Sequence, residues 1–418
     1  MRRLINPANL ISLAIVAVVI AIVARANWKD GQQSRGRDSA ALPLAGPLAG
    51  TGAGTGAGFT TSRADLEARV KAMDARVASH PDDVRAALQL ADGLLRLTRV
   101  TGNTGLAVRA EDILKKALAE DPGNYDVNRM LGALYLSRHR FRDAIAAGEK
   151  ARDLRPDDPL NYGVIGDGHL ELGDYPQAFA AFDRMMQLRP SAAAYARVAY
   201  ARELQGDLRG AVVSMKLAAD ATAADDPEAL AWTRAQLGEL YLQLGRLHDA
   251  KVEFSSASQA FPGHPFAVAG YAKVIAAEGD AAGALTLLEG LARTSPTPDL
   301  AARIGDLLDR LGRREEALKQ YALAEAGWRG DVPEPKALAR FLADHGKPDD
   351  ALTVALAAAA DRHDVFTEDA LAWAYFKTGR LAEARKTMAL ALRTGTQDKD
   401  IRSHAVSIAG ASSLVAAQ

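Results

Sequence analysis

The sequence predicts an all-α fold, an α-solenoid of about nine helix–turn–helix units that follow one another along the chain. Three recurring residues predict it: a small residue, a turn residue and a closing proline. The small residue recurs at Ala110, Ala144, Ala178, Ala211, Ala250, Ala284, Ala317, Ala351 and Ala384, in steps of 34, 34, 33, 39, 34, 33, 34 and 33 residues. The turn residue precedes each alanine, at Gly105, His139, Gly173, Gly206, Gly245, Gly279, Gly312, Gly346 and Gly379, and many units close at prolines, namely Pro122, Pro156, Pro190, Pro262 and Pro296. Self-similarity with a period of about 20–50 residues is the signature of a repeat architecture.

Two consecutive copies show the unit most clearly. Gly132 and Ala144 recur as Gly166 and Ala178, and 166 − 132 = 178 − 144 = 34 residues. Small residues at these positions let two antiparallel helices approach closely, and Pro156 ends the second helix. Period and pattern resemble the tetratricopeptide repeat (TPR), a helix–turn–helix unit of about 34 residues. Glycine suits the turn because the chain leaves the first helix through a left-handed conformation, which we expect His139 to tolerate.

Composition and charge exclude several classes of function. The 418 residues carry 51 basic and 52 acidic side chains, for a formal net charge of −1. A general nucleic-acid binder needs a basic surplus to release counterions, so we expect no nucleic-acid partner. The chain has no cysteine, which excludes disulfides, thiolate catalysis and cysteine-ligated metal sites.

The N-terminal segment, residues 1–27, is predicted to be a single transmembrane anchor. Leu10–Ala24 is apolar except for Ser12, a length between the core of a signal peptide and a full bilayer span. Ala24-Arg25-Ala26 also fits a cleavage site, so a cleaved signal remains an alternative, as does an interfacial helix. Arginines flank both ends of the apolar run, and we favour a signal-anchor with the solenoid outside the cytoplasm, in the periplasm.

Residues 28–63 are predicted to form a flexible linker between the anchor and the solenoid. The tract Gly50–Gly58 alternates glycine with alanine and threonine and has almost nothing to bury. It is not a phosphate-binding loop, because no Gly-Lys-Ser/Thr follows and the spacing is not Gly-x-Gly-x-x-Gly.

The solenoid is predicted over residues 64–395. Ser62 can cap a lone first helix, whose apolar residues recur at Leu66, Val70, Met73 and Val77. The repeat departs from its pattern at three places, Thr98–Thr104, Ala221–Pro227 and Ala326–Pro335, where we expect loops. Residues 396–418 are predicted to form a capping helix and tail, with an apolar stripe of Ile401, Ala405 and Ile408.

No residue pattern in the sequence indicates catalysis. The eight histidines are scattered with no close ligand pair, so each is interpreted as a turn or surface residue. The carboxylate pairs Asp157-Asp158 and Asp225-Asp226 lie between units and are interpreted as helix caps. Few residues follow the last unit, too few for a catalytic domain. We therefore expect no enzyme, no cofactor, no metal and no small-molecule substrate.

In the TPR family the first helix of each unit lines a concave groove. Carried onto this chain, that register implies a partner-binding groove formed by Tyr200, Trp232, Glu239, Phe266, Lys273, Phe366, Trp373 and Phe376. An aromatic groove with charged residues suits an extended or helical peptide. The alternative for Trp373 and Phe376 is packing under the C-terminal helix, and packing is also an alternative for Trp232 and Phe266.

One known variety of the repeat clamps a partner's terminal carboxylate with lysine, asparagine and arginine. This chain departs from it, because Arg129 fills one basic position but Ala133 and Asp167 stand where an asparagine is expected. The resemblance thus implies a membrane-tethered scaffold that binds protein or peptide partners, in envelope assembly or maturation. The alternative is a structural accessory subunit of a membrane, secretion or polysaccharide enzyme complex, with no peptide site of its own.

Overall fold

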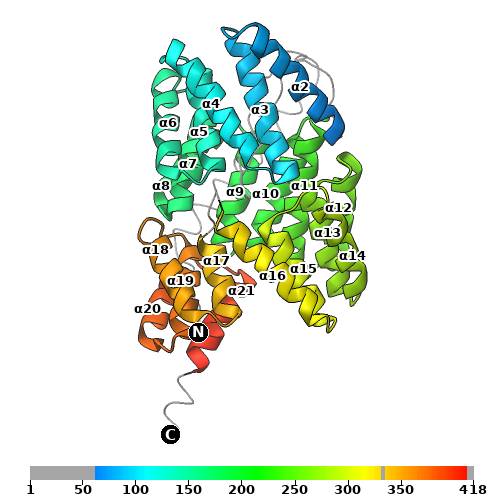
Figure 1. The fold of residues 1–418 in the computed structure, drawn as a ribbon. Helices are drawn as coiled ribbons and strands as arrows, with labels where there is room; N and C mark the ends of the chain where they lie inside the picture. Colours follow the sequence, from blue (N-terminus) through cyan, green and yellow to red (C-terminus); the bar gives the residue numbers. More distant parts are fainter. Residues whose placement is uncertain (1–61, 331–334, 412–418) are drawn as a thin grey trace. The chain divides into compact units, whose positions relative to one another are not determined.

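The computed structural model describes residues 62–330 and 335–411, and all regular structure in these ranges is α-helical (Figure 1). In chain order the helices are α2 (Arg63–Ser79), α3 (Val84–Thr101), α4 (Gly105–Glu120), α5 (Tyr125–Ser137), α6 (Phe141–Leu154), α7 (Pro159–Leu172), α8 (Tyr175–Leu188), α9 (Ala192–Leu204), α10 (Leu208–Ala221), α11 (Pro227–Gln243), α12 (Leu247–Ala260), α13 (Pro265–Ala277), α14 (Ala281–Ala292), α15 (Pro298–Arg310), α16 (Arg314–Trp328), α17 (Pro335–Asp344), α18 (Pro348–Ala359), α19 (Val365–Lys377), α20 (Leu381–Ala391) and α21 (Lys399–Gly410).

The helices α3 to α20 pair into nine consecutive units, α3 with α4 through α19 with α20, and the predicted solenoid is confirmed. Each of the nine recurring alanines lies in the second helix of its unit, and every one of them is 0% exposed. Alanine belongs there because a larger side chain would push the two helices of the unit apart.

The turn within each unit has the predicted left-handed conformation. Eight of these turns use a residue at the predicted position, including His139, whose φ is 56°. The first unit differs, because its left-handed residue is Gly102, with φ 72°, whereas Gly105 begins α4. The prediction of Gly105 was therefore wrong. Helix α3 extends to Thr101, so the residues inserted in this unit follow the turn glycine instead of preceding it.

Two predicted irregularities can be compared with the structure. Helix α10 ends at Ala221 and α11 begins at Pro227, as the sequence predicts for a connector. The stretch Ala326–Pro335 is less irregular than expected, because α16 continues to Trp328, whose side chain is buried. Burial of that indole accompanies the extension of the helix into the predicted loop.

Lone helices precede and follow the nine units. Ser62 caps α2 and accepts a hydrogen bond from Asp65 N, as predicted. The recurring alanine lies 12 residues before the closing proline, as Ala144 does before Pro156, and counting 81 − 12 from Pro81 gives Arg69. With a charged residue at that position, α2 is suited to terminate the array. At the other end α21 follows the last unit where the sequence predicts a capping helix, and its Ile401 and Ile408 are buried.

The predicted anchor (1–27) and nearly all of the predicted linker (28–63) lie outside the described residues. Among the helices that the structure describes, none combines the length and the apolar character that a membrane span needs.

Distant units of the solenoid contact one another. A Cβ atom built at Gly102 would lie 2.9 Å from Pro296 O, one at Gly173 2.4 Å from His363 O, and one at Gly206 2.4 Å from Gly395 O. These glycines are the turns of units 1, 3 and 4, and the residues they meet are in the loops after units 6, 8 and 9. The offset is constant, 6 − 1 = 8 − 3 = 9 − 4 = 5 units. We call these three contacts the seam.

An apolar cluster continues through the seam. Buried side chains of α7 to α9, among them Tyr175 and Tyr200, share one cluster with Val365 of α19 and with Ile401 and Ile408 of α21. The seam also carries backbone hydrogen bonds, since His363 N donates to Leu172 O at 3.0 Å. Successive superhelical turns therefore pack against each other instead of leaving an open spiral.

Candidate protein-binding surface

The eight predicted groove residues divide into three groups by exposure. Tyr200, Trp232 and Trp373 are buried, and Trp232 is only 1% exposed. Glu239, Lys273, Phe366 and Phe376 are half-buried. Phe266 is the most accessible, at 41%. A buried indole offers a partner no surface, so in this conformation the three buried rings support their neighbours instead of facing a ligand.

Two of the predicted residues meet in the centre of the array. Lys273 Nζ of α13 donates to Glu239 Oε1 of α11 at 2.6 Å. Burial lowers the pKa of Lys273, and the charge of Glu239 opposes that shift. Phe266 lies at the start of α13, with its ring 5.8 Å from that of His264. The pair and the exposed ring form the accessible part of the predicted groove.

The C-terminal aromatic residues follow the packing alternative. The ring of Trp373 stacks on His404 of α21 at 4.0 Å between centroids, and on Phe376 at 5.1 Å. Its Nε1 donates to Asp344 Oδ1 of α17 at 2.8 Å. Trp373 is thus fixed by α17, α19 and α21, and it presents little surface to a partner.

A buried charged cluster that the sequence did not predict joins the first unit to the fifth. Arg96 Nη1 and Nη2 donate to Asp226 at 2.8 and 3.0 Å, and Arg99 Nε donates to Glu228 Oε1 at 2.6 Å. His264 Nε2 lies 3.5 Å from Glu228 Oε1. Burial alone would raise the pKa of Glu228, but Arg99, His264 and Arg96 outweigh it and hold the pKa well below its usual range.

A second unpredicted cluster reinforces the seam. Arg362 in the loop before α19 donates to Glu171 of α7, through Nη2 at 2.6 Å and to the backbone oxygen through Nε at 3.2 Å. Tyr175 Oη accepts a hydrogen bond from Val365 N at 2.8 Å. Arg142 of α6 pairs with Asp361 at 2.9 Å. These contacts span sequence separations of 190 to 219 residues.

The histidines require a correction. All eight were expected in turns or at the surface. His264 lies in the turn before α13, as expected, and is buried there, whereas His404 is a buried residue inside α21. His404 Nδ1 lies 2.9 Å from Asp369 Oδ1, and a carboxylate only accepts, so this nitrogen carries the proton.

The interpretation of the two carboxylate pairs as helix caps holds, because Asp158 caps α7 and Asp226 caps α11. In the described part of the chain, no group of three or more histidine or acidic side chains could hold a metal ion.

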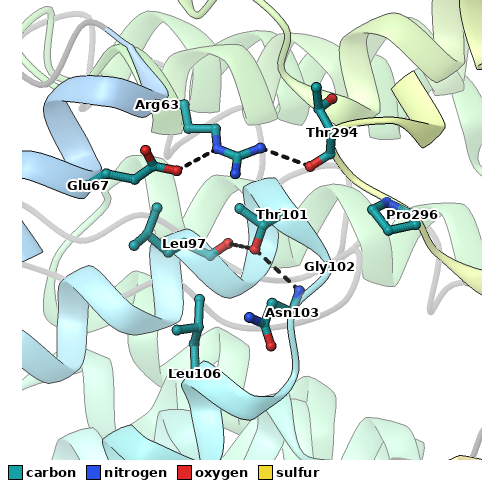
Figure 2. Close-up of a pocket in the computed structure, with 9 residues that line it drawn as sticks. All are labelled: Arg63, Glu67, Leu97, Thr101, Gly102, Asn103, Leu106, Thr294 and Pro296. Atoms are coloured by element: carbon teal, nitrogen blue, oxygen red, sulfur yellow. Dashed lines mark hydrogen bonds and ion pairs between the residues drawn. The ribbon is translucent and has the colours of Figure 1, made fainter. Parts of the chain in front are cut away.

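A pocket of about 570 Å³ adjoins the seam at the N-terminal end (Figure 2). Its lining mixes polar and apolar residues from α2, from α3 and α4 with the turn between them, and from the α14–α15 loop: Arg63, Glu67, Leu97, Thr101, Gly102, Asn103, Leu106, Thr294 and Pro296. Figure 2 shows Arg63 between Glu67 and Thr294, and its guanidinium donates to both, at 2.7 and 2.8 Å. The guanidinium of Arg63 therefore joins two superhelical turns of the array.

The fold and this surface define a helical-repeat scaffold. A sequence profile of the tetratricopeptide repeat matches residues 105–163. The Hsp70-Hsp90 organizing protein of Triticum aestivum is 39% identical over 75 residues, which are 18% of this chain and 13% of that protein. The chain thus spans a small part of the length of this curated relative. Residues 105–163 therefore carry the tetratricopeptide repeat, and the described helices repeat the same helix pair along the chain.

Solved structures are similar over most of the chain. The APC/C hetero-tetramer Cut9-Hcn1 matches with a TM-score of 0.50 and 15% identity, over 82% of this chain and 59% of that chain. The human IFIT1 dimer with m7Gppp-AAAA matches with a TM-score of 0.51 and 15% identity, over 80% of this chain and 77% of that chain. At this identity the likeness shows the fold alone. TPR folds typically serve as non-catalytic scaffolds for protein–protein interaction.

Proposed function

We propose that this protein is a membrane-tethered scaffold that binds protein partners through the first helices of its units, in assembly or maturation of the cell envelope. The observation that carries the proposal is the repeat array itself, nine consecutive helix–turn–helix units. The apolar segment Leu10–Ala24 supports the tether, and a linker in residues 28–63 would hold the solenoid off the membrane.

The accessible part of the groove supplies recognition chemistry. Phe266 is a large exposed ring on α13, about two helical turns before Lys273 of the Glu239–Lys273 pair. Phe366 is half-buried beside Lys336, whose Nζ lies 5.8 Å from its ring. An aromatic anchor with charged neighbours suits a peptide or a helix that carries apolar residues at helical spacing.

The groove is tested by crosslinking and pull-down of the full chain from membranes. Phe266→Ala should remove most of a captured partner, whereas Val213→Ala, at an exposed position on α10, should leave capture unchanged. Equal capture by the two variants would show that Phe266 is not part of a partner site.

The tether and its side are tested by protease digestion of intact cells, spheroplasts and lysed membranes, followed with an antibody to the C-terminus. We expect digestion in spheroplasts without lysis, which places the solenoid in the periplasm. Protection until lysis would place it in the cytoplasm and overturn the envelope assignment. A full-length band in the membrane pellet supports a retained anchor over a cleaved signal.

A second candidate function is favoured by the seam. Successive superhelical turns pack against each other there, and such a packed array suits a structural accessory subunit of a membrane, secretion or polysaccharide enzyme complex with no peptide site of its own. Co-purification at fixed stoichiometry, unaffected by Phe266→Ala, would select this candidate over peptide capture.

A further inference from the structure

The C-terminal helix α21 does more than cover the last unit, because its segment reaches four units at once. Gly395 lies against the turn of unit 4 at Gly206. Lys399 Nζ donates to the carbonyl of Leu242 in unit 5 at 3.1 Å. Asp400 pairs with Arg340 of unit 8. The body of α21 packs on α19 and α20 of unit 9. An ordinary terminal cap would contact the last unit alone.

The surface beneath α21 has a distinct chemistry. Asp369 of α19 is fully buried, and His404 donates a hydrogen bond to it from Nδ1. The imidazole also stacks on Trp373, with an angle of 14° between the rings. Arg340 Nε of α17 lies 3.9 Å from Asp369 Oδ2, so the surface itself holds part of this charge, and a ligand that brings a hydrogen-bond donor completes the coordination of the carboxylate.

Four side chains of α21 contact the surface beneath it. Asp400 offers a carboxylate to Arg340, and His404, one helical turn later, offers the donor to Asp369. Ile401 and Ile408 fill the apolar cluster on either side. These four positions lie on one face of a helix. We call Arg340, Asp369 and Trp373, with the Leu242 carbonyl, the cradle.

We propose that the cradle is the principal partner site and that α21 is its intramolecular ligand. The partner that fits is an amphipathic helix with an acidic first turn, a histidine or another donor four residues later, and apolar residues on the same face. The inference rests on the proposed function as a protein-binding scaffold, and it names the class of partner and the place where it binds.

The short length of α21 suits its replacement by a partner helix. It has 12 residues, and isolated helices of that length are marginal in water, so its contacts with the cradle hold it in place. Its outer face is solvated, and Val406 is 73% exposed. A tethered helix competes at an effective concentration of the order of millimolar, which a partner helix with better anchors can overcome.

The experiment measures whether a peptide can take the place of α21 in the cradle, and it uses the full chain in detergent. The probe is a fluorescein-labelled peptide with the sequence of residues 396–411, followed by anisotropy. The wild-type chain should show no saturable binding at micromolar peptide. Asp400→Lys and His404→Ala each loosen α21, and each should lower the peptide Kd at least tenfold. Val406→Ala, on the opposite face of the same helix, should behave as wild type.

A charge exchange tests the register. The Arg340→Glu chain should bind a peptide carrying Asp400→Lys at least tenfold more tightly than the unchanged peptide. If both loosened chains keep their helical circular dichroism and bind the peptide no better than Val406→Ala, the cradle is not a partner site. If they form dimers that exclude the peptide, the occupant is a second copy of the chain, which overturns the assignment to a partner helix.

The outcome is separable from that of the proposed function. Peptide exchange with undiminished partner capture by Phe266→Ala would remove the role of Phe266 and leave the cradle in place. Absence of exchange, with capture lost in Phe266→Ala, would remove the cradle and leave the scaffold function.

Discussion

Alanine at Gly173 tests whether successive superhelical turns pack against each other. Gly173 and Gly379 occupy the same position in units 3 and 9 and have similar backbone angles, φ 88° and 78°. Their surroundings differ. A Cβ at Gly173 would meet the backbone of His363 at 2.4 Å, whereas a Cβ at Gly379 has nothing within 4 Å. Gly379→Ala is therefore a control matched in backbone strain.

The expected magnitudes follow from these contacts. A non-glycine residue in the left-handed region costs about 1–2 kcal/mol, and both variants share that cost. Only Gly173→Ala must also displace the loop at His363. The hydrogen bonds at risk are His363 N to Leu172 O and Val365 N to Tyr175 Oη. With about 1 kcal/mol for each bond and a similar loss in apolar packing, Gly173→Ala should cost about 2–3 kcal/mol more than its control.

Urea unfolding followed by circular dichroism gives the free energies, and hydrogen exchange locates the change. Gly173→Ala should also speed exchange at His363, 190 residues away in sequence, while Gly379→Ala should not. Equal destabilisation by the two variants, within about 0.5 kcal/mol, would show that the seam is open in solution and would refute the closed superhelix.

Three further variants test the repeat register and the buried charges. Ala250→Leu overfills the contact between α11 and α12 and should cost about 1–3 kcal/mol in urea unfolding; full stability would contradict the register. Glu228→Gln leaves the buried guanidinium of Arg99 uncompensated and should cost about 3–5 kcal/mol, read as a lower Tm; an unchanged Tm would place the cluster in solvent. Burial raises the pKa of Glu203 to about 7, above its unfolded value, so this carboxyl stabilises the fold below about pH 4.5 and that stability is lost as the pH rises through 7. In wild type this group should lower the free energy of unfolding by up to about 3 kcal/mol between pH 5 and 8.5, and Glu203→Gln should remove that decrease. An unchanged dependence of the unfolding free energy on pH would assign the decrease to another group.

The local structure of each unit could be predicted from the sequence because the same constraints recur nine times. Ala144 and its equivalents are buried because two helices must approach closely, and this need has a fixed spacing along the chain. The caps at Ser62 and Asp226 follow from unsatisfied amide groups at helix starts, which are also local. The prediction of Gly105 as the turn residue was wrong because an insertion has no fixed register. The turn could have lain on either side of the inserted residues.

The closure of the superhelix could not be predicted from the sequence. Curvature accumulates from a small rotation between neighbouring units, and a few degrees at each step decide whether units five apart touch. The pairing of Arg96 with Asp226 spans 130 residues, and no sequence period indicates it. Trp232 could be placed on the first helix of its unit but could not be recognised as buried, since the repeat register does not specify which side chains cover a given position.

The seam limits how a partner can reach the interior. In an ordinary solenoid each unit contacts only its neighbours, and the spiral opens at little cost. Here opening the spiral breaks backbone hydrogen bonds at Leu172 and the cluster at Glu228, together with the apolar core that units 3 and 9 share. Releasing α21 breaks the contacts of one short helix, namely the polar contacts of Lys399, Asp400 and His404 and the part of the apolar core that Ile401 and Ile408 fill. Exchange at the cradle is therefore the lower-energy route by which this scaffold can admit a helical partner while the seam at units 1 and 3 holds the rest of the array.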